Sequence, residues 1–122
     1  MAYERAGFVA GSNTSFKNIL ANDDDVTTKK ITVLSGQVQP AGAVMGQITS
    51  GGKYILSLSA ASDGSQTPDL ILAEDVDASG GDREAIAYEH ATVVATALTL
   101  GTAHTIASIR AGLRAKGIYI DD

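Results

Sequence analysis

The large aliphatic side chains of this chain are placed very unevenly, and this placement limits where a core can form. Of the 27 Val, Ile and Leu residues, four lie in the first 30 positions and 23 lie in the other 92 of the 122. The four early ones are Val9, Ile19, Leu20 and Val26. A segment so poor in large apolar residues contributes little to a hydrophobic core. We therefore expect residues 1–30 to form an extended arm and residues 31–122 to form the folded domain.

The arm is nevertheless rich in aromatic side chains. Tyr3, Phe8 and Phe16 are three of the six aromatic residues in the chain, whereas a solvated tail is normally poor in them. These rings can dock either on their own domain or on another chain. The second hypothesis predicts a binding arm with six contact residues, Tyr3, Phe8, Val9, Phe16, Ile19 and Leu20. Because Asp23–Asp25 and Lys29–Lys30 indicate a charged joint, removal of residues 1 to about 25 should leave a folded domain.

From Ile31 onward the pattern is typical of strands with one helix. The expected strands are Ile31–Leu34, Ala43–Thr49, Tyr54–Ser59, Asp69–Ala73, one or two within Glu84–Leu100, and Ile118–Ile120. Gly46 is a possible β-bulge, and the glycines at positions 51 and 52 predict a hairpin turn. The spacing of Ile106, Ile109 and Leu113 predicts an amphipathic helix over Thr102–Lys116, with Thr102 or Thr105 as its cap, ending at Gly117. The fold class is therefore mainly β (α+β), with one C-terminal amphipathic helix.

Composition excludes several classes of function. With no Cys there is neither a disulfide framework nor a thiolate site, and the net charge of −5 disfavours non-specific nucleic-acid binding. No apolar run approaches the length of a membrane helix, and the first residues lack a signal peptide's apolar stretch. We expect a soluble protein made in the cytoplasm, with no membrane partner.

Two loops carry the side chains that could bind a ligand. Asp75, Asp77 and Ser79 have the spacing that opens a calcium loop, but Ile86 stands where the closing bidentate Glu is required. A small non-enzymatic β module that binds sugar or calcium through loops 60–68 and 75–82 remains the alternative hypothesis.

No complete catalytic set is present in the sequence. His90 and His104 have no partner at metal-ligand spacing, and no nucleophile-elbow motif surrounds any Ser. A hydrolase using paired acids such as Asp75 and Asp77 is the remaining enzymatic hypothesis. We expect no enzyme activity, no metal and no cofactor.

Four ordered motifs resemble those of the lambda-type phage head decoration proteins. They are Pro40-Ala-Gly-Ala-Val-Met-Gly-Gln-Ile-Thr49, Gly52-Lys-Tyr-Ile-Leu-Ser-Leu-Ser-Ala60, Asp63-Gly-Ser65, and Leu70-Ile-Leu-Ala-Glu-Asp-Val-Asp-Ala78 followed by Gly80-Gly-Asp82. The resemblance covers roughly residues 31 to 90, with Gly117–Ile120 a weaker match.

The resemblance implies a compact β-clip-like domain that assembles as a homotrimer and has no enzymatic activity. It also implies a place on the outer surface of the virion capsid, where the trimer cements neighbouring major capsid subunits after head expansion. The arm would then add strand hydrogen bonds to an exposed edge of the major capsid protein.

Overall fold

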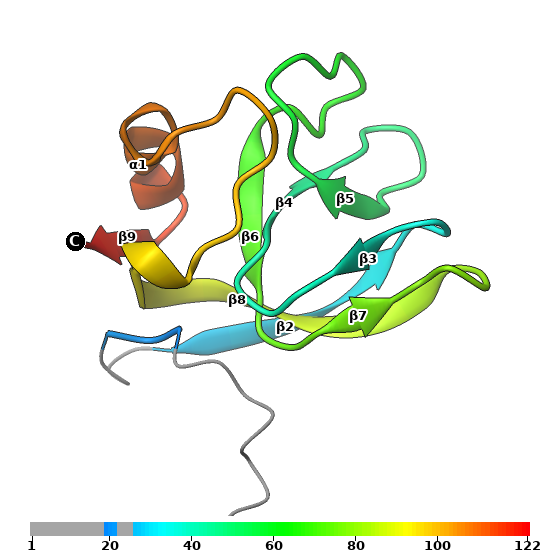
Figure 1. Cartoon of the computed structure of the whole chain (residues 1–122), viewed down its shortest axis with the longest axis horizontal. Helices are drawn as coiled ribbons and strands as arrows, with labels where there is room; N and C mark the ends of the chain where they lie inside the picture. The colour runs from blue at the N-terminus through cyan, green and yellow to red at the C-terminus, as the bar shows by residue number, and fades with distance from the viewer. Residues whose placement is uncertain (1–18, 22–25) are drawn as a thin grey trace, which may run out of the picture.

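A computed structural model describes residues 19–21 and 26–122 of the chain. Its elements are β2 (Thr27–Val33), β3 (Val38–Gln39), β4 (Val44–Gln47), β5 (Tyr54–Leu56), β6 (Pro68–Leu72), β7 (Val76–Asp77), β8 (Arg83–Val94), a 3-10 turn (Ala95–Ala97), α1 (Ile106–Ala115) and β9 (Ile118–Asp121). The prediction of a mainly β fold with one helix near the C-terminus is confirmed (Figure 1). No helix in these described ranges has the length and hydrophobicity needed to cross a membrane.

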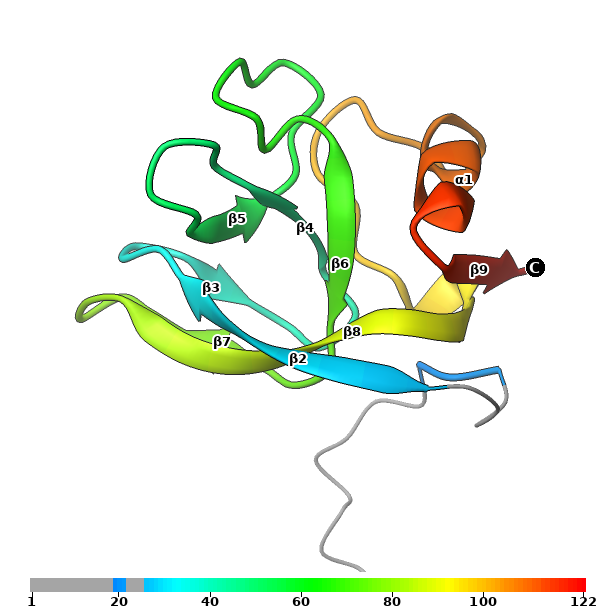
Figure 2. The same ribbon diagram turned by 180° about the vertical axis from the view of Figure 1, so that it is seen from behind.

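Five strands pair in a closed ring. The order β2-β5-β4-β6-β8 returns to its start because β2 also pairs with β8, and β9 adds to β8 outside the ring. The β2–β8 pair is antiparallel and runs from Thr27 opposite His90 to Val33 opposite Arg83, whereas the ring closes at β5 through one parallel pairing, Val33 with Tyr54. Figure 2 shows β2 and the long β8 crossing side by side at the base of the molecule.

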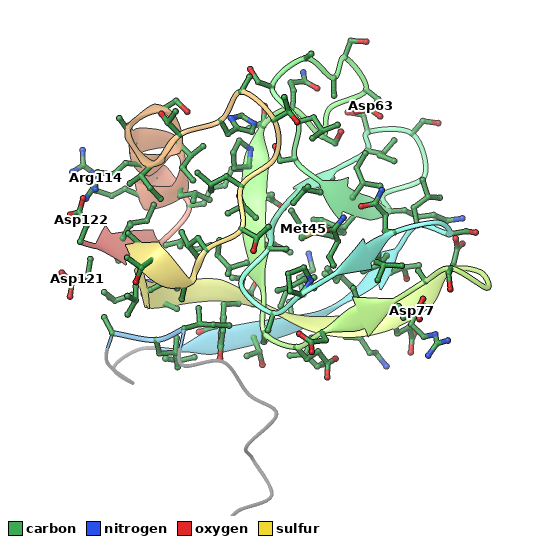
Figure 3. The ribbon with its side chains drawn as sticks, viewed as in Figure 1. Met45, Asp63, Asp77, Arg114, Asp121 and Asp122 are labelled. Carbon is green, nitrogen blue, oxygen red and sulfur yellow. The ribbon has the colours of Figure 1, made fainter. Side chains whose placement is uncertain are left out.

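The strands carry two cores, one on each face. Alternate residues point to opposite faces of a strand, so neighbouring residues of β4 and β6 serve different cores. One core comprises Ile31, Val33, Ala43, Met45, Tyr54, Leu70, Leu72, Val76, Ala78, Ala85 and Ala87. Figure 3 places Met45 in the middle of the ring. The other core lies between the ring and α1 and comprises Ile19, Ala41, Val44, Ile71, Ala91, Val93, Ile109, Leu113, Ile118 and Ile120.

A bulge in β8 lets this strand serve both cores. Thr27 lies opposite His90 and Thr28 lies opposite Tyr88, so β8 has one extra residue at this point. The extra residue shifts the alternation by one. Ala85 and Ala87 therefore point into the ring core, whereas Ala91 and Val93, although also odd-numbered, point toward α1.

The helix begins at Ile106, four residues later than expected. Thr105 caps it: the Thr105 side chain accepts a hydrogen bond from the Ser108 backbone N–H, and the Ser108 side chain accepts one from the Thr105 N–H. The preceding residues form a turn instead, in which the His104 N–H donates to the Gly101 carbonyl at 3.1 Å. The helix ends before Gly117, whose φ of +97° suits glycine.

The predicted hairpin is also confirmed, since β4 and β5 pair antiparallel with Gln47 opposite Tyr54. The bulge expected at Gly46 lies in the neighbouring strand instead: Met45 pairs with Leu70 and Gly46 with Pro68, so the extra residue is in β6, opposite Gly46. The glycine is required there: a Cβ at position 46 would lie 2.0 Å from the Ser65 carbonyl oxygen. The short strands β3 and β7, which pair with each other, were not predicted.

Candidate functional site

The root of the arm is part of the folded domain. Ile19 is 2% exposed and lies in the core beneath α1, and Leu20 packs against the same core. The Val94 N–H donates to the Ile19 carbonyl at 2.7 Å, and the Ala21 N–H donates to the Thr92 carbonyl at 2.9 Å. Residues 19–21 therefore act as a short edge strand beside β8. The expectation that the first 30 residues contribute nothing large to the core is wrong for Ile19, because an average over a segment hides one buried side chain.

The other four predicted arm contacts, Tyr3, Phe8, Val9 and Phe16, lie outside the described residues. Lys29 and Lys30, which were predicted to belong to a charged joint, lie within strand β2, because β2 already begins at Thr27. Lys30 pairs with Glu84 at 3.6 Å, but both side chains are mostly exposed, so this ion pair adds little stability. Residues 19–21 and β2 both pair with β8: Leu20 lies opposite Val93, and β2 lies opposite the part of β8 from Arg83 to His90.

Loop 60–68 is closed by a carboxylate that binds its own backbone. Asp63 Oδ1 accepts hydrogen bonds from the Ser65 hydroxyl at 2.5 Å and from the Ser65 N–H at 3.0 Å. These bonds, the hydroxyl's first, lower the pKa of Asp63 from its ordinary value. The adjacent Gly64 N–H donates to Gln66 Oε1 at 2.9 Å. The acid of this loop stabilises a turn.

Loop 75–82 repeats the same arrangement. Asp77 Oδ1 accepts from the Ser79 hydroxyl at 2.6 Å and from the Ser79 N–H at 3.0 Å, which lowers the pKa of Asp77. Asp75 Oδ1 accepts from the Ala41 N–H at 2.7 Å. The carboxylates that opened the calcium-loop pattern are therefore engaged with the protein itself. Within residues 19–21 and 26–122, no three His, Cys, Asp or Glu side chains gather as a metal site requires.

The two loops of the ligand-binding hypothesis line separate recesses. Asp75 and Asp77 border a recess of about 570 Å³ between β3 and β7, which Val38, Gln39, Pro40, Val76 and Arg83 complete. Gly64 and Thr67 border a smaller polar recess of about 200 Å³, together with Gln47, Thr49, Asp69 and Lys116. Figure 3 shows Asp63 on a loop toward the top of the molecule and Asp77 toward the bottom, at β7. These loops do not converge on one ligand.

The histidines each contact a different element. The His104 ring nitrogen Nε2 lies 3.1 Å from the hydroxyl of Ser57, which is fully buried. The His90 ring meets the Tyr119 ring edge to face, with 6.1 Å between their centroids. Tyr119 lies on β9 and is 43% exposed, although its neighbours Ile118 and Ile120 are buried. The strand Ile118–Ile120 was predicted, but the functional interest of its outward-facing Tyr119 was not, although the alternation Ile-Tyr-Ile indicates that this side chain is exposed.

One comparison with known proteins identifies a family. The family model described as bacteriophage lambda head decoration protein D matches residues 10–118, which include residues 19–21 and every strand and helix up to Ile118, the first residue of β9. No curated protein matches the chain.

Proposed function

Because the chain belongs to the bacteriophage lambda head decoration protein D family, we propose that it binds the outer surface of the expanded head as a homotrimer and stabilises the contacts between major capsid subunits. Membership makes it a structural phage head decoration protein with a place in the virion capsid, in a family that is not a known enzyme family. The family match is the observation that carries this function. Synthesis in the host cytoplasm, before the protein joins the head, is part of the same proposal.

The arm is the proposed capsid-binding segment. Its contacts with the major capsid protein would come from Tyr3, Phe8, Val9 and Phe16, which all precede the anchored root. Ile19 and Leu20 would act at the base of the arm, where they hold it to β8. Support comes from the aromatic content of residues 1–18. The family match covers Phe16 and the anchored root and begins after Tyr3, Phe8 and Val9.

Deletion of residues 1–18 tests the arm. The deletion stops before Ile19 because a longer one would remove a buried core residue. The shortened protein should keep its melting temperature and its trimer in sedimentation, but should no longer sediment with expanded capsids that lack decoration protein. The full-length chain should bind these capsids and not unexpanded ones.

Each part of the proposal has its own contradicting result. Unchanged capsid binding by the shortened protein would exclude the arm as the gripping segment. A monomer in sedimentation of the full-length chain would exclude the trimer. Equal binding to unexpanded capsids would exclude dependence on expansion.

A further inference from the structure

The exposed residues of β9, Tyr119 and Asp121, lie on one face of the small sheet around this strand. Ile118 and Ile120 point to α1, so Tyr119 and Asp121 point to the opposite side. Figure 3 places Asp121 below β9, away from the helix. The main neighbours of β9 among the described elements are β8 and α1. On β8, Thr92 and Val94 alternate with the buried Ala91 and Val93 and are half-buried.

The Tyr119 ring is exposed on this face and contacts a neighbouring ring, that of His90. It is the only exposed aromatic residue in the described part of the chain, because Tyr54 is buried and Tyr88 is half-buried. The edge-to-face contact with His90 limits the freedom of the ring. An exposed tyrosine of restricted motion is typical of the residues that dominate binding energy at protein interfaces. It offers both an apolar body and a hydroxyl.

The arm leaves the domain from the same sheet. Leu20 lies opposite Val93, and Val93 lies opposite Ile120 on its other side. One strand therefore separates the root of the arm from β9, which is about 10 Å at the usual spacing between strands. Eighteen residues precede Ile19, so any surface that holds the last of them lies close to Tyr119.

The outer edge of β9 is less suited to binding than its face. The Ile120 carbonyl accepts a hydrogen bond from Arg110 Nη1 at 3.0 Å, and Arg110 Nη2 also pairs with Asp122 at 2.5 Å. A side chain that occupies an edge carbonyl prevents the addition of another strand there. A partner that approaches this part of the molecule therefore meets the face.

We propose that the face formed by Thr92, Val94, Tyr119 and Asp121 is a second docking surface for the outer side of the major capsid protein, beside the arm. This inference rests on the proposed function. The recognising surface would offer an apolar recess for the Tyr119 ring and a Lys or Arg for the Asp121 carboxylate. The arm brings this face to the shell, and the face then limits how the domain is oriented on it.

Tyr119→Ala in the full-length chain tests the proposal, with Leu58→Ala as the matched control. Leu58 is 38% exposed, close to the value for Tyr119, and follows β5 rather than lying on β8 or β9. In sedimentation with expanded capsids, Tyr119→Ala should weaken binding at least tenfold, and Leu58→Ala should change it less than twofold. If Tyr119→Ala loses its native circular dichroism, Asp121→Lys on the same face replaces it, with a several-fold loss expected at low salt.

Deletion of residues 1–18, measured on the same capsids, separates this inference from the proposed function. If the deletion abolishes binding while Tyr119→Ala and Asp121→Lys bind like the parent, the docking face is overturned and the arm stands. If the deletion leaves binding intact while Tyr119→Ala abolishes it, the arm is overturned and the face stands. If Tyr119→Ala turns a trimer into a monomer, the face is a contact between copies and the proposal is overturned.

Discussion

The replacement of Ile19 by Ala should loosen the root of the arm without unfolding the domain. Ile19 is 2% exposed and packs with Val93 and Ile120 beneath α1. A buried Ile→Ala change typically destabilises a protein by about 2–5 kcal/mol. Here the loss has an upper limit, since residues 19–21 can detach from β8 while the ring of strands stays closed.

The limit follows from what holds residues 19–21. Burial of the Ile19 side chain contributes about 1.5–3 kcal/mol, and burial of the apolar surface that Ile19 covers contributes about the same again, which gives roughly 3–6 kcal/mol in total. The two backbone hydrogen bonds to β8 add about 1–3 kcal/mol. Fixing three residues costs about 3–6 kcal/mol. The central values of these three contributions sum to about 2 kcal/mol in favour of the held root, so Ile19→Ala should lower the free energy of unfolding by about 2 kcal/mol.

Urea denaturation of the full-length chain measures this loss, and hydrogen exchange locates it. In the parent, the amides of Ala21 and Val94 should be protected, because they donate to Thr92 and Ile19. In Ile19→Ala these two amides should exchange faster while those of the ring keep their rates. Leu20→Ala is the control, with a smaller expected loss because Leu20 is only partly buried. Unprotected amides at both positions in the parent would refute the anchored root.

Three further predictions concern the domain. Gly101→Ala should destabilise the domain by about 3 kcal/mol or more, because a Cβ at position 101 would lie 1.9 Å from the Ser57 carbonyl oxygen. Gly112→Ala in α1 is the control: its Cβ meets no atom within 4 Å, so it should stabilise the domain by about 0.5–1 kcal/mol. Thermal unfolding measures both changes. Burial and the hydrogen bond from the Tyr54 hydroxyl to Asp69 raise the pKa of Tyr54. The stability that the neutral Tyr54 contributes should therefore be fully present below about pH 10 and be lost above it, where the tyrosine of the unfolded chain ionises. Denaturation from pH 9 to 11 should show a smaller fall in stability for Tyr54→Phe than for the parent, and an equal fall would contradict this cause. Ser65→Ala should raise the pKa of Asp63 toward its ordinary value and leave the pKa of Asp77 unchanged, whereas Ser79→Ala should raise the pKa of Asp77 and leave that of Asp63 unchanged. Titration of the carboxyl groups by NMR measures both, and a shift at the aspartate of the unmutated loop would contradict these hydrogen bonds as the cause.

Local patterns in the sequence predicted local structure well. The hairpin and the helix around Ile109 and Leu113 depend on neighbouring residues, and both are present. The strands within Glu84–Leu100 were harder to predict, because apolar and polar residues do not alternate regularly along this segment. The bulge near Tyr88 explains this: the shift by one residue breaks the period-two pattern in the middle of a single 12-residue strand.

Long-range pairing could not be predicted from such patterns. The two-residue strands β3 and β7 are too short to show a period, and the closure of β2 on β8 joins residues far apart in the chain. The same limit applies to the candidate site. Ile19 was recognised as an arm residue but not as a core residue, and Tyr119 became notable only because the fold places β9 one strand away from the root of the arm.

The anchored root changes what capsid binding has to supply. If all of residues 1–30 became ordered only on binding, the loss of backbone conformational entropy would cost about 30–60 kcal/mol, at about 1–2 kcal/mol per residue. Residues 19–21 and β2 are already held by β8, so ordering residues 1–18 on the capsid would cost about 18–36 kcal/mol. The face around Tyr119 adds a contact on strands that are already folded, so it offsets part of that cost with little ordering of its own. An arm with a fixed origin beside a preformed face therefore favours one orientation of the domain on the shell, which an arm attached through a long joint would not.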